Sequence, residues 1–350
     1  MWTISYPSRK AARMTCPTCN RCARAVIEPR HRQKAGGGSK VWTACRKTAR
    51  SIIFSARAIF GTGGGKKTEC QEHKKCRKLM PKPIISWMGG KRKLLGELLA
   101  NIPGHHCFCE VFCGGAALFF GKDPSPVEVI NDINGELVNL YRVVKNDFEK
   151  LADRLEELFP SRQLFMEYRR FEENRHLPEI ERAARFFYVL KCSFGCNLVP
   201  PRWGFSKESK SRFDPESVRD ILFQAHRRLR NAYVENRDFT ELILTYDGER
   251  TFFYCDPPYL DTYGYGADFD ETHFQKLADL ARNVKGKILI SANDHPVIRK
   301  LFDGMVIKEI RTKYTIQNGN NDMPANELLI SNYEQDLYDG HTGKTGELFA

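Results

Sequence analysis

A carboxylate, two prolines and an aromatic ring follow one another at Asp256-Pro257-Pro258-Tyr259. The short apolar run before them, residues 251–255, predicts a buried strand that ends at the carboxylate. The two prolines fix the backbone and remove two N–H donors, while their carbonyls can still accept hydrogen bonds. The Asp256 carboxylate, the Pro257 carbonyl and the Tyr259 ring together suit the gripping of a planar group that carries an NH2. Taken by themselves, these residues fit a strand that ends in a Pro-rich turn equally well.

Two glycines near the start of the organised region lie between an aromatic ring and a cation, in Trp87-Met88-Gly89-Gly90-Lys91. Glycines allow a ligand to approach the backbone closely. The leucines of residues 92–100 then recur at helical spacing. A helix with a glycine-rich lead is the alternative interpretation, and it is favoured when this stretch is considered without the rest of the chain.

Residues 106–130 predict a strand, a glycine turn, a helix and a second strand. The first strand, residues 106–112, leads into Cys113-Gly114-Gly115, which fits a nucleotide-like ligand at the C-terminal end of a parallel strand. The turn lacks the G-x-G-x-x-G spacing of dinucleotide folds, so a pyrophosphate is not inferred. The second strand, residues 127–130, ends in Asn131-Asp132, where an acid commonly holds ribose hydroxyls. Asp132 could instead cap the helix predicted at 135–144, but Asn134 can serve as that cap.

At this point the chain, from about residue 83 to 333, resembles the Dam-like family of DNA adenine-N6 methyltransferases. Four motifs carry the resemblance in the family's order: Trp87 to Lys91, Phe112-Cys113-Gly114-Gly115-Ala116, Asn131 to Asn134, and Asp256 to Tyr259. One departure is Ala116, where the family usually has a second loop glycine; its methyl group would tighten the cofactor pocket. The resemblance implies a Rossmann-like α/β methyltransferase sheet, mostly parallel with a C-terminal antiparallel hairpin, and an inserted helical target-recognition subdomain.

The resemblance also implies S-adenosylmethionine as the cofactor and methyl transfer to N6 of adenine in DNA. The residues carried over as cofactor contacts are Trp87, Lys91, Glu110, Phe112, Gly114, Asp132 and Asp256. Those carried over as catalytic are Asp256, Pro257, Pro258 and Tyr259. Elementary chemistry agrees, because a sulfonium is favoured by a ring and a carboxylate, and a methionine carboxylate needs a cation such as Lys91. No metal is expected.

Residues 141–235 separate the cofactor motifs from the Asp-Pro-Pro-Tyr motif, and helical patterns cover 148–159, 164–173 and 183–194. The irregular stretch 196–212 mixes aromatic side chains with four cations: Arg202, Lys207, Lys210 and Arg212. Cations hold phosphates and side chains read base edges, so these four are the candidate DNA contacts. A solvated helical subdomain with scattered cations is the alternative. The expected partner is double-stranded DNA with the target adenine swung out, bound by a monomer.

Residues 236–335 complete the predicted catalytic domain, together with 81–140. A glycine-containing loop at 261–266 follows the Asp-Pro-Pro-Tyr motif. His273 lies on a predicted helix at 271–282 and is expected to pack rather than to act as a base. Strands are predicted at 287–291, 305–311 and 327–333, with a hairpin loop at 318–321. The polar residues 336–350 form a tail.

The charge of the chain is concentrated in residues 1–80, which hold 19 Lys and Arg against 3 acidic residues. The remaining residues hold 36 against 40, although the whole chain carries +12. Any DNA contact in residues 81–350 must therefore use local patches rather than bulk charge. Low hydrophobicity and high charge predict disorder for residues 1–80. The same composition also fits a transit peptide, a nucleic-acid tail or a segment outside the functional protein. We expect the working domain to start near Met80.

Six of the twelve cysteines fall in residues 1–80, and Cys16, Cys19 and Cys22 form two overlapping C-x-x-C pairs. A zinc site is conceivable there, but unstructured thiols are the favoured interpretation because a second matching pair is missing. Cysteines in predicted core strands indicate a reducing, cytoplasmic compartment. No apolar run reaches the roughly 18 residues that a membrane helix needs.

Four alternative functions remain open on the sequence: methylation of cytosine N4, of RNA adenine or of a protein glutamine, and a non-catalytic DNA-binding relic. Aspartate at position 256, rather than serine or asparagine, resembles the adenine enzymes. The DNA recognition sequence and the existence of a restriction partner are not written in these motifs.

Overall fold

The computed structural model describes residues 82–196, 200–260, 269–315 and 322–335. The predicted extension at 1–80, with its candidate zinc cysteines, lies outside these ranges. The predicted loop at 261–266, the hairpin loop at 318–321 and the tail at 336–350 also lie outside these ranges. Within the described residues, no helix has the length and apolar character needed to cross a membrane.

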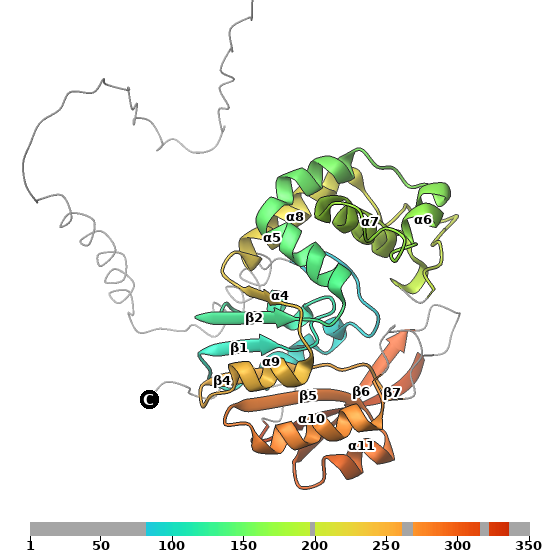
Figure 1. Ribbon diagram of the computed structural model, residues 1–350. Helices are drawn as coiled ribbons and strands as arrows, with labels where there is room; N and C mark the ends of the chain where they lie inside the picture. Colours follow the sequence, from blue (N-terminus) through green and yellow to red (C-terminus); the bar gives the residue numbers. More distant parts are fainter. Residues whose placement is uncertain (1–81, 197–199, 261–268, 316–321, 336–350) are drawn as a thin grey trace, which may run out of the picture. The chain divides into compact units, whose positions relative to one another are not determined.

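One sheet carries the described part of the chain (Figure 1). Its strands lie in the order β3-β2-β1-β4-β5-β7-β6. Their bounds are β1 (Cys107–Glu110), β2 (Val127–Asn131), β3 (Tyr233–Glu235), β4 (Thr251–Cys255), β5 (Lys287–Asn293), β6 (Val306–Thr315) and β7 (Asp322–Ser331). The pairs from β3 to β5 are parallel, whereas β7 is antiparallel to both β5 and β6. The predicted α/β sheet, mostly parallel with a C-terminal antiparallel hairpin, is confirmed.

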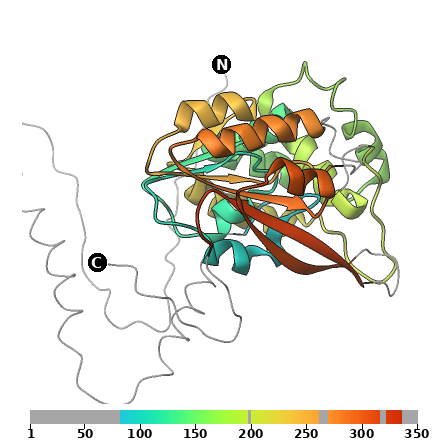
Figure 2. The ribbon, with the colours of Figure 1, turned by 90° about the horizontal axis from the view of Figure 1, so that it is seen from below.

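Helices cover both faces of this sheet (Figure 2). The helices between residues 91 and 229 are η1 (Lys91–Lys93), α3 (Leu95–Ala100), α4 (Ala117–Gly121), α5 (Gly135–Glu156), α6 (Arg162–Tyr168), α7 (Glu179–Cys192), η2 (Phe194–Cys196) and α8 (Pro215–Leu229). The helices between residues 239 and 301 are α9 (Phe239–Tyr246), α10 (Glu271–Asn283) and α11 (Pro296–Leu301).

Alternation along the strands divides the apolar side chains between the two faces. On β4, Phe252 and Tyr254 join the core beneath α3, α4 and α5, while Phe253 and Cys255 join the core beneath α9, α10 and α11. A strand buried on both faces reads as a continuous apolar run. This is why residues 251–255 show no polar alternation.

The helices between α5 and α8 differ in detail from the sequence prediction. Two separate helices were expected at 135–144 and 148–159, but α5 runs through both with a kink at Asp147 (φ −135°, ψ 36°). The predicted helix at 164–173 is shorter, since α6 starts after the Ser161 cap and ends at Tyr168. Helix α7 begins four residues before the predicted start of 183, at Glu179. Hydrophobic spacing located these helices but did not fix their ends.

A buried ionic cluster ties α8 to the sheet. Arg228 of α8 forms a two-point ion pair with Glu128 of β2 and donates to the Phe119 carbonyl. Lys122 donates to Glu128 Oε1, which it shares with Arg228, at 2.6 Å. The paired cations hold the pKa of Glu128 below its usual range, although burial opposes them. Since a buried charge is costly unless paired, this cluster fixes how α8 docks on β2.

Candidate active site

A cavity of about 920 Å³ lies at the C-terminal ends of β1, β2 and β4. Its walls come from six parts of the chain: the lead at 83–92, the end of β1 and the turn after it, the turn after β2, the loop and helix around Phe171 and Arg182, the end of β4 and the residues after it, and Phe269. Ligand sites in α/β folds form at this edge, and the volume is within the usual range for a small-molecule pocket.

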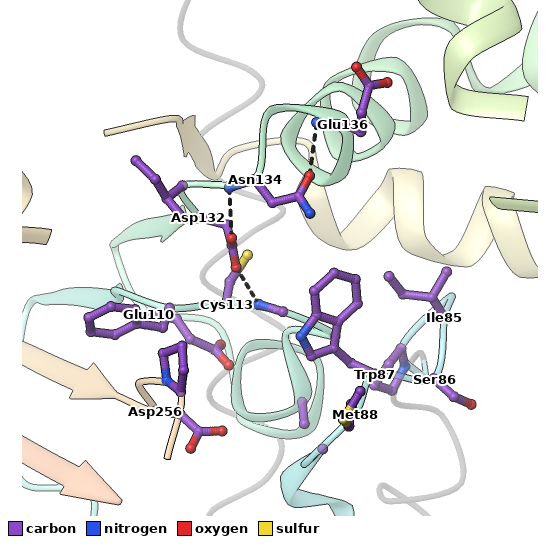
Figure 3. Close-up of a pocket in the computed structure, with 18 of the residues that line it drawn as sticks. Ile85, Ser86, Trp87, Met88, Glu110, Cys113, Asp132, Asn134, Glu136 and Asp256 are labelled. Atoms are coloured by element: carbon purple, nitrogen blue, oxygen red, sulfur yellow. Dashed lines mark hydrogen bonds between the residues drawn. The ribbon is translucent and has the colours of Figure 1, made fainter. Parts of the chain in front are cut away.

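Three carboxyl groups stand in a row along this edge (Figure 3). Glu110, at the end of β1, pairs in register with Ile130 of β2 and with Tyr254 of β4. Asp132 and Asp256 each come two residues after those partners, so they flank Glu110 on either side. The sheet order β2-β1-β4 therefore brings together acids that lie far apart in the sequence.

Asp132 organises the two turns beside it. Its Oδ2 accepts the Gly114 N–H at 2.9 Å, and its Oδ1 accepts the Asn134 N–H at 2.9 Å. Asn134 caps α5 as expected, by accepting the N–H groups of Glu136 and Leu137. Asp132 is thus free of the cap, although both of its oxygens bind backbone. Burial raises the pKa of Asp132 above its usual value, despite these hydrogen bonds.

Glu110 is a buried acid that faces the cavity. Its Oε2 accepts the Phe119 N–H at 2.7 Å, at the start of α4. Among the described residues it forms no ion pair within 4.0 Å. Burial, with a smaller contribution from Asp256, raises the pKa of Glu110 to about 8. A carboxyl in a ligand pocket that has no ion-pair partner within 4.0 Å is suited to a positively charged ligand group.

The glycine turn after β1 packs against Trp87. A Cβ on Gly114 would lie 2.6 Å from the Trp87 ring, and Gly114 has a φ of +46°. Both observations explain why a glycine is needed there. Ala116, with a φ of +51°, is the one non-glycine residue with positive φ among those described. Its methyl group is fully buried in the core and does not line the cavity, so the expected tightening of the cofactor pocket is wrong; its cost is in the backbone.

Asp256 is held from two sides after β4. Ser291 of β5 donates to its Oδ1 at 2.9 Å, and Lys91 Nζ lies 2.8 Å from the same oxygen. Among the described residues, Oδ2 of Asp256 has no hydrogen-bond donor, and the side chain is 21% exposed toward the cavity. Pro257 and Pro258 also line the cavity. The carboxylate therefore has one oxygen fixed and one available.

Tyr259 follows Pro258 but is not among the residues that line the cavity. Its hydroxyl donates to Glu327 Oε1 at 2.6 Å. The Lys91 ammonium lies 4.5 Å from the centre of the Tyr259 ring and 3.8 Å from Glu327 Oε1. Burial raises the pKa of Glu327, while Lys91 and the Tyr259 hydroxyl oppose that rise. The structure thus brings Lys91 to the Asp-Pro-Pro-Tyr motif, where the resemblance had assigned it to the cofactor.

Aromatic rings line another part of the cavity. Phe112 packs 5.5 Å from Phe239 and 5.5 Å from Phe269, the latter edge to face. His273 stacks on Phe269 and accepts or donates at Asp270, where it completes the N-terminal cap of α10. His273 therefore packs as expected from the sequence, and it also has a capping role that was not predicted.

The four candidate DNA contacts are exposed and do not line the cavity. Arg212 reaches back to donate to the Ser193 carbonyl at 3.0 Å. Trp203 packs edge to face on Phe165, so its ring belongs to the helical core. Phe205, by contrast, is 69% exposed among the cations. The exposed part of this stretch is thus basic with one projecting ring.

Two groups that hold the site were not predicted. Ser291 and Glu327 both lie inside strands that the sequence predicted, and no role was predicted for either side chain. The signal available for Glu327 was an acid directly before the apolar run Leu328-Leu329-Ile330, in a strand expected to be buried. No group of three or more potential metal ligands occurs within the described ranges.

Comparisons with known proteins find a matching family and related enzymes. The model of the D12 class N6 adenine-specific DNA methyltransferase family matches residues 87–316. A type II methyltransferase, M.CviBI, of Paramecium bursaria Chlorella virus NC1A is 27% identical over 72% of this chain and 100% of its own length. The DNA adenine methylase of Escherichia coli K12 is 27% identical over 70% of this chain and 93% of its own. The type II methyltransferase M1.LlaDCHI of Lactococcus lactis subsp. cremoris is 28% identical over 73% and 97%.

Proposed function

The chain belongs to the D12 class of N6 adenine-specific DNA methyltransferases, and on that premise we propose how its cavity works. The activity is methylation of the N6 amino group of adenine in DNA. In our proposal S-adenosylmethionine is the methyl donor, and Asp256 and Pro257 hold the amino group of an adenine swung out of duplex DNA. The observation that carries this proposal is that Asp256 and the Asp132–Gly114 turn face one cavity.

The residues around the cavity fit that cofactor. Each Asp132 oxygen accepts one N–H and retains a second lone pair, which suits a ribose diol. Glu110 is a buried acid with no ion pair within 4.0 Å among the described residues, which suits an ammonium or sulfonium group. The Trp87 ring lies against the Gly114 turn and offers a flat apolar wall. When bound, S-adenosylmethionine supplies an electrophilic methyl group on a positively charged sulfur.

Asp256 and Pro257 act on the amine. The N6 lone pair of adenine is delocalised into the ring, so the amine is a poor nucleophile, and attack places positive charge on nitrogen. Asp256 Oδ2 and the Pro257 carbonyl each accept one N–H, and their attraction grows as that charge develops. Asp256 is also the base that takes the proton the methylated nitrogen must lose. Ser291 holds the other carboxylate oxygen during these steps.

Tyr259 supports the target base after it leaves the duplex. Swinging a base out of the stack costs a few kcal/mol. Stacking on an aromatic ring recovers about 1–3 kcal/mol. The Tyr259 hydroxyl donates to Glu327, so the ring is already ordered and loses little conformational entropy when the base stacks on it.

The insertion at 141–235 is proposed to recognise the DNA target. Arg202, Lys207 and Lys210 lie exposed outside the cavity, which suits contacts with phosphates. Phe171 and Arg182 of the same insertion line the cavity, so the insertion reaches both the DNA side and the reaction site. The domain arrangement of 81–140 with 236–335 around 141–235 is part of this proposal.

The direct test is the adenine methylation of DNA from cells that express the protein. We expect N6-methyladenine in the hydrolysed DNA and protection at one short sequence in methylation-sensitive digestion. Cells with the Asp256→Ala variant are the matched control and should show neither. Methylation confined to cytosine N4 or to RNA would overturn the proposal.

A further inference from the structure

The structure contains a second buried carboxylate next to the amine-binding group. Glu327 of β7 is 1% exposed and pairs in register with Asn293 of β5. Lys91 lies between the two acids, 2.8 Å from Asp256 Oδ1 and 3.8 Å from Glu327 Oε1. Lys91 is itself 4% exposed, so solvent does not screen its charge. The cation and the two anions form one buried cluster.

The position of Lys91 creates an electrostatic problem for the proposed reaction. The Lys91 ammonium beside Asp256 offsets the negative charge of the carboxylate, which the reacting amine needs for stabilisation. The developing charge on N6 is positive, so a nearby ammonium would oppose it. One cation and one anion would leave the amine site neutral.

Glu327 removes this problem, and we propose that it is a positioning residue for methyl transfer. Its negative charge offsets the positive charge of Lys91, so the cation opposes the charge developing on the amine less strongly. Lys91 can then fix Asp256 Oδ1 together with Ser291, and Oδ2 keeps its acceptor strength. This inference rests on the proposed function, in which Asp256 grips the amine.

The same carboxylate also fixes the ring on which the base stacks. Glu327 Oε1 accepts the Tyr259 hydroxyl at 2.6 Å. Glu327 therefore sets the charge at Asp256 through Lys91 and the ring orientation at Tyr259 through a hydrogen bond. The two roles can be separated, because glutamine can accept the hydroxyl proton but cannot balance the cation.

The experiment compares Glu327→Gln with the wild-type protein in single-turnover methylation of a DNA duplex, with S-adenosylmethionine and DNA saturating. We expect the rate to fall roughly 10- to 100-fold, which is the scale of one lost charge at this range. Dissociation constants for cofactor by calorimetry and for DNA by fluorescence anisotropy should stay within about threefold. Glu327→Asp should recover most of the lost rate, because it restores the charge.

A matched control is Glu309→Gln on the neighbouring strand. Glu309 is 59% exposed and pairs with Arg299, so the same substitution there should leave all three measurements unchanged. Base extrusion gives a readout without methyl transfer: a 2-aminopurine at the target, with a cofactor analogue that lacks the methyl group, should brighten equally for wild type and Glu327→Gln. A loss of extrusion or of cofactor affinity in Glu327→Gln would overturn the charge-balancing role.

The double variant Lys91→Met/Glu327→Gln keeps the inference testable if Glu327→Gln does not fold. Removing both buried charges costs less stability than removing one. The double variant also returns the net charge at the amine to that of Asp256. With cofactor saturating, we expect its rate to lie within about tenfold of wild type and above that of Glu327→Gln. A folded double variant that binds both substrates but transfers no faster than Glu327→Gln, or at less than a hundredth of the wild-type rate, would overturn the inference.

Failure of this inference and failure of the proposed function give different results. If Glu327→Gln methylates adenine at the wild-type rate while Asp256→Asn does not, the inference is wrong and the function stands. If the wild-type protein places no methyl group on adenine, the proposed function itself is wrong.

Discussion

Asp132 and Asp256 occupy equivalent positions on the two strands that flank β1. Each lies two residues beyond the residue that pairs with Glu110, namely Ile130 on β2 and Tyr254 on β4. The two acids nevertheless have different partners. Asp132 binds backbone N–H groups of two turns, whereas Asp256 binds the side chains of Ser291 and Lys91.

In the proposed function, these partners suit the two acids to different roles. Asp132, which holds the Gly114 turn, belongs to the part of the cavity that suits the cofactor. Asp256, with one oxygen available toward the cavity, belongs to the part that suits the amine. Glu110 lies between them (Figure 3). A methyl group that passes from cofactor to amine would cross the cavity in front of Glu110.

Gly114→Ala tests the cofactor side. The new Cβ would lie 2.6 Å from the Trp87 ring, and the left-handed backbone adds about 1–2 kcal/mol of strain. We expect the cofactor dissociation constant to rise about tenfold or more, because the indole must move out of its place on the turn. Isothermal titration calorimetry with S-adenosylmethionine measures this directly.

The matched control for Gly114→Ala is Gly104→Ala. No atom lies within 4 Å of a Cβ built on Gly104, so cofactor affinity and melting temperature should not fall. Equal affinity losses in both variants would contradict the role of the Gly114 turn.

Glu110→Gln tests the buried acid. Because burial raises the pKa of Glu110 to about 8, the carboxyl is protonated at neutral pH in the cofactor-free protein. A cationic ligand favours the ionised form, so binding should release up to one proton, and affinity should rise with pH between about 6 and 8. Isothermal titration calorimetry of cofactor binding in buffers of different ionisation enthalpy measures the number of protons released. In Glu110→Gln the released proton should disappear.

Thermal unfolding checks the same group without any ligand. Glu110 ionises at about 8 in the folded protein and near its ordinary value of 4.5 when unfolded. Between those values the folded state holds the extra proton, so Glu110 lowers stability as pH rises, by up to about 1.4 kcal/mol per pH unit. Glu110→Gln should be less sensitive to pH across this window. Identical pH profiles for the two proteins would contradict the raised pKa.

Lys207→Ala/Lys210→Ala tests the DNA side. Each lost phosphate contact should reduce the slope of log affinity against log salt by about 0.9, and weaken binding to all sequences alike. Fluorescence anisotropy at several salt concentrations gives the slope. Lys150→Ala, which removes an exposed cation paired with Asp147 on α5, should leave the slope unchanged.

A chain that starts at Met80 tests the predicted domain limits. The family match begins at residue 87, and the described residues begin at 82. We expect the shortened protein to fold and to methylate adenine in the single-turnover assay. Loss of folding on removal of residues 1–79 would show that the N-terminal segment is part of the working domain.

The sequence predicted the parts of the fold whose signals are local. The strand at 251–255 was visible as an apolar run, and Asn134 as a cap between a strand and a helix. Hydrophobic spacing also located α5 and α7, but it does not specify helix ends, since α5 continues through a kink at Asp147.

The site was predictable only where one motif carried its own chemistry. Asp256 and Asp132 stood out because each follows a strand. The family resemblance assigned Lys91 to the cofactor, and nothing in the neighbouring sequence indicated that it lies near β4 or β7. The contacts of Lys91 with Asp256 and Glu327 depend on strand order, and no local pattern encodes strand order.

The central claim is that the Asp256 carboxylate grips the amine in the transition state, and Asp256→Asn tests it most directly. Asparagine keeps the shape of the side chain, and its oxygen can still accept a hydrogen bond from Ser291. Its NH2 group, in the place of Oδ2, cannot accept a hydrogen bond from the N–H of the amine. Single-turnover methylation with saturating cofactor and DNA should be at least about 10²- to 10³-fold slower, with DNA affinity unchanged. An Asp256→Asn protein that methylates adenine at the wild-type rate would contradict the account.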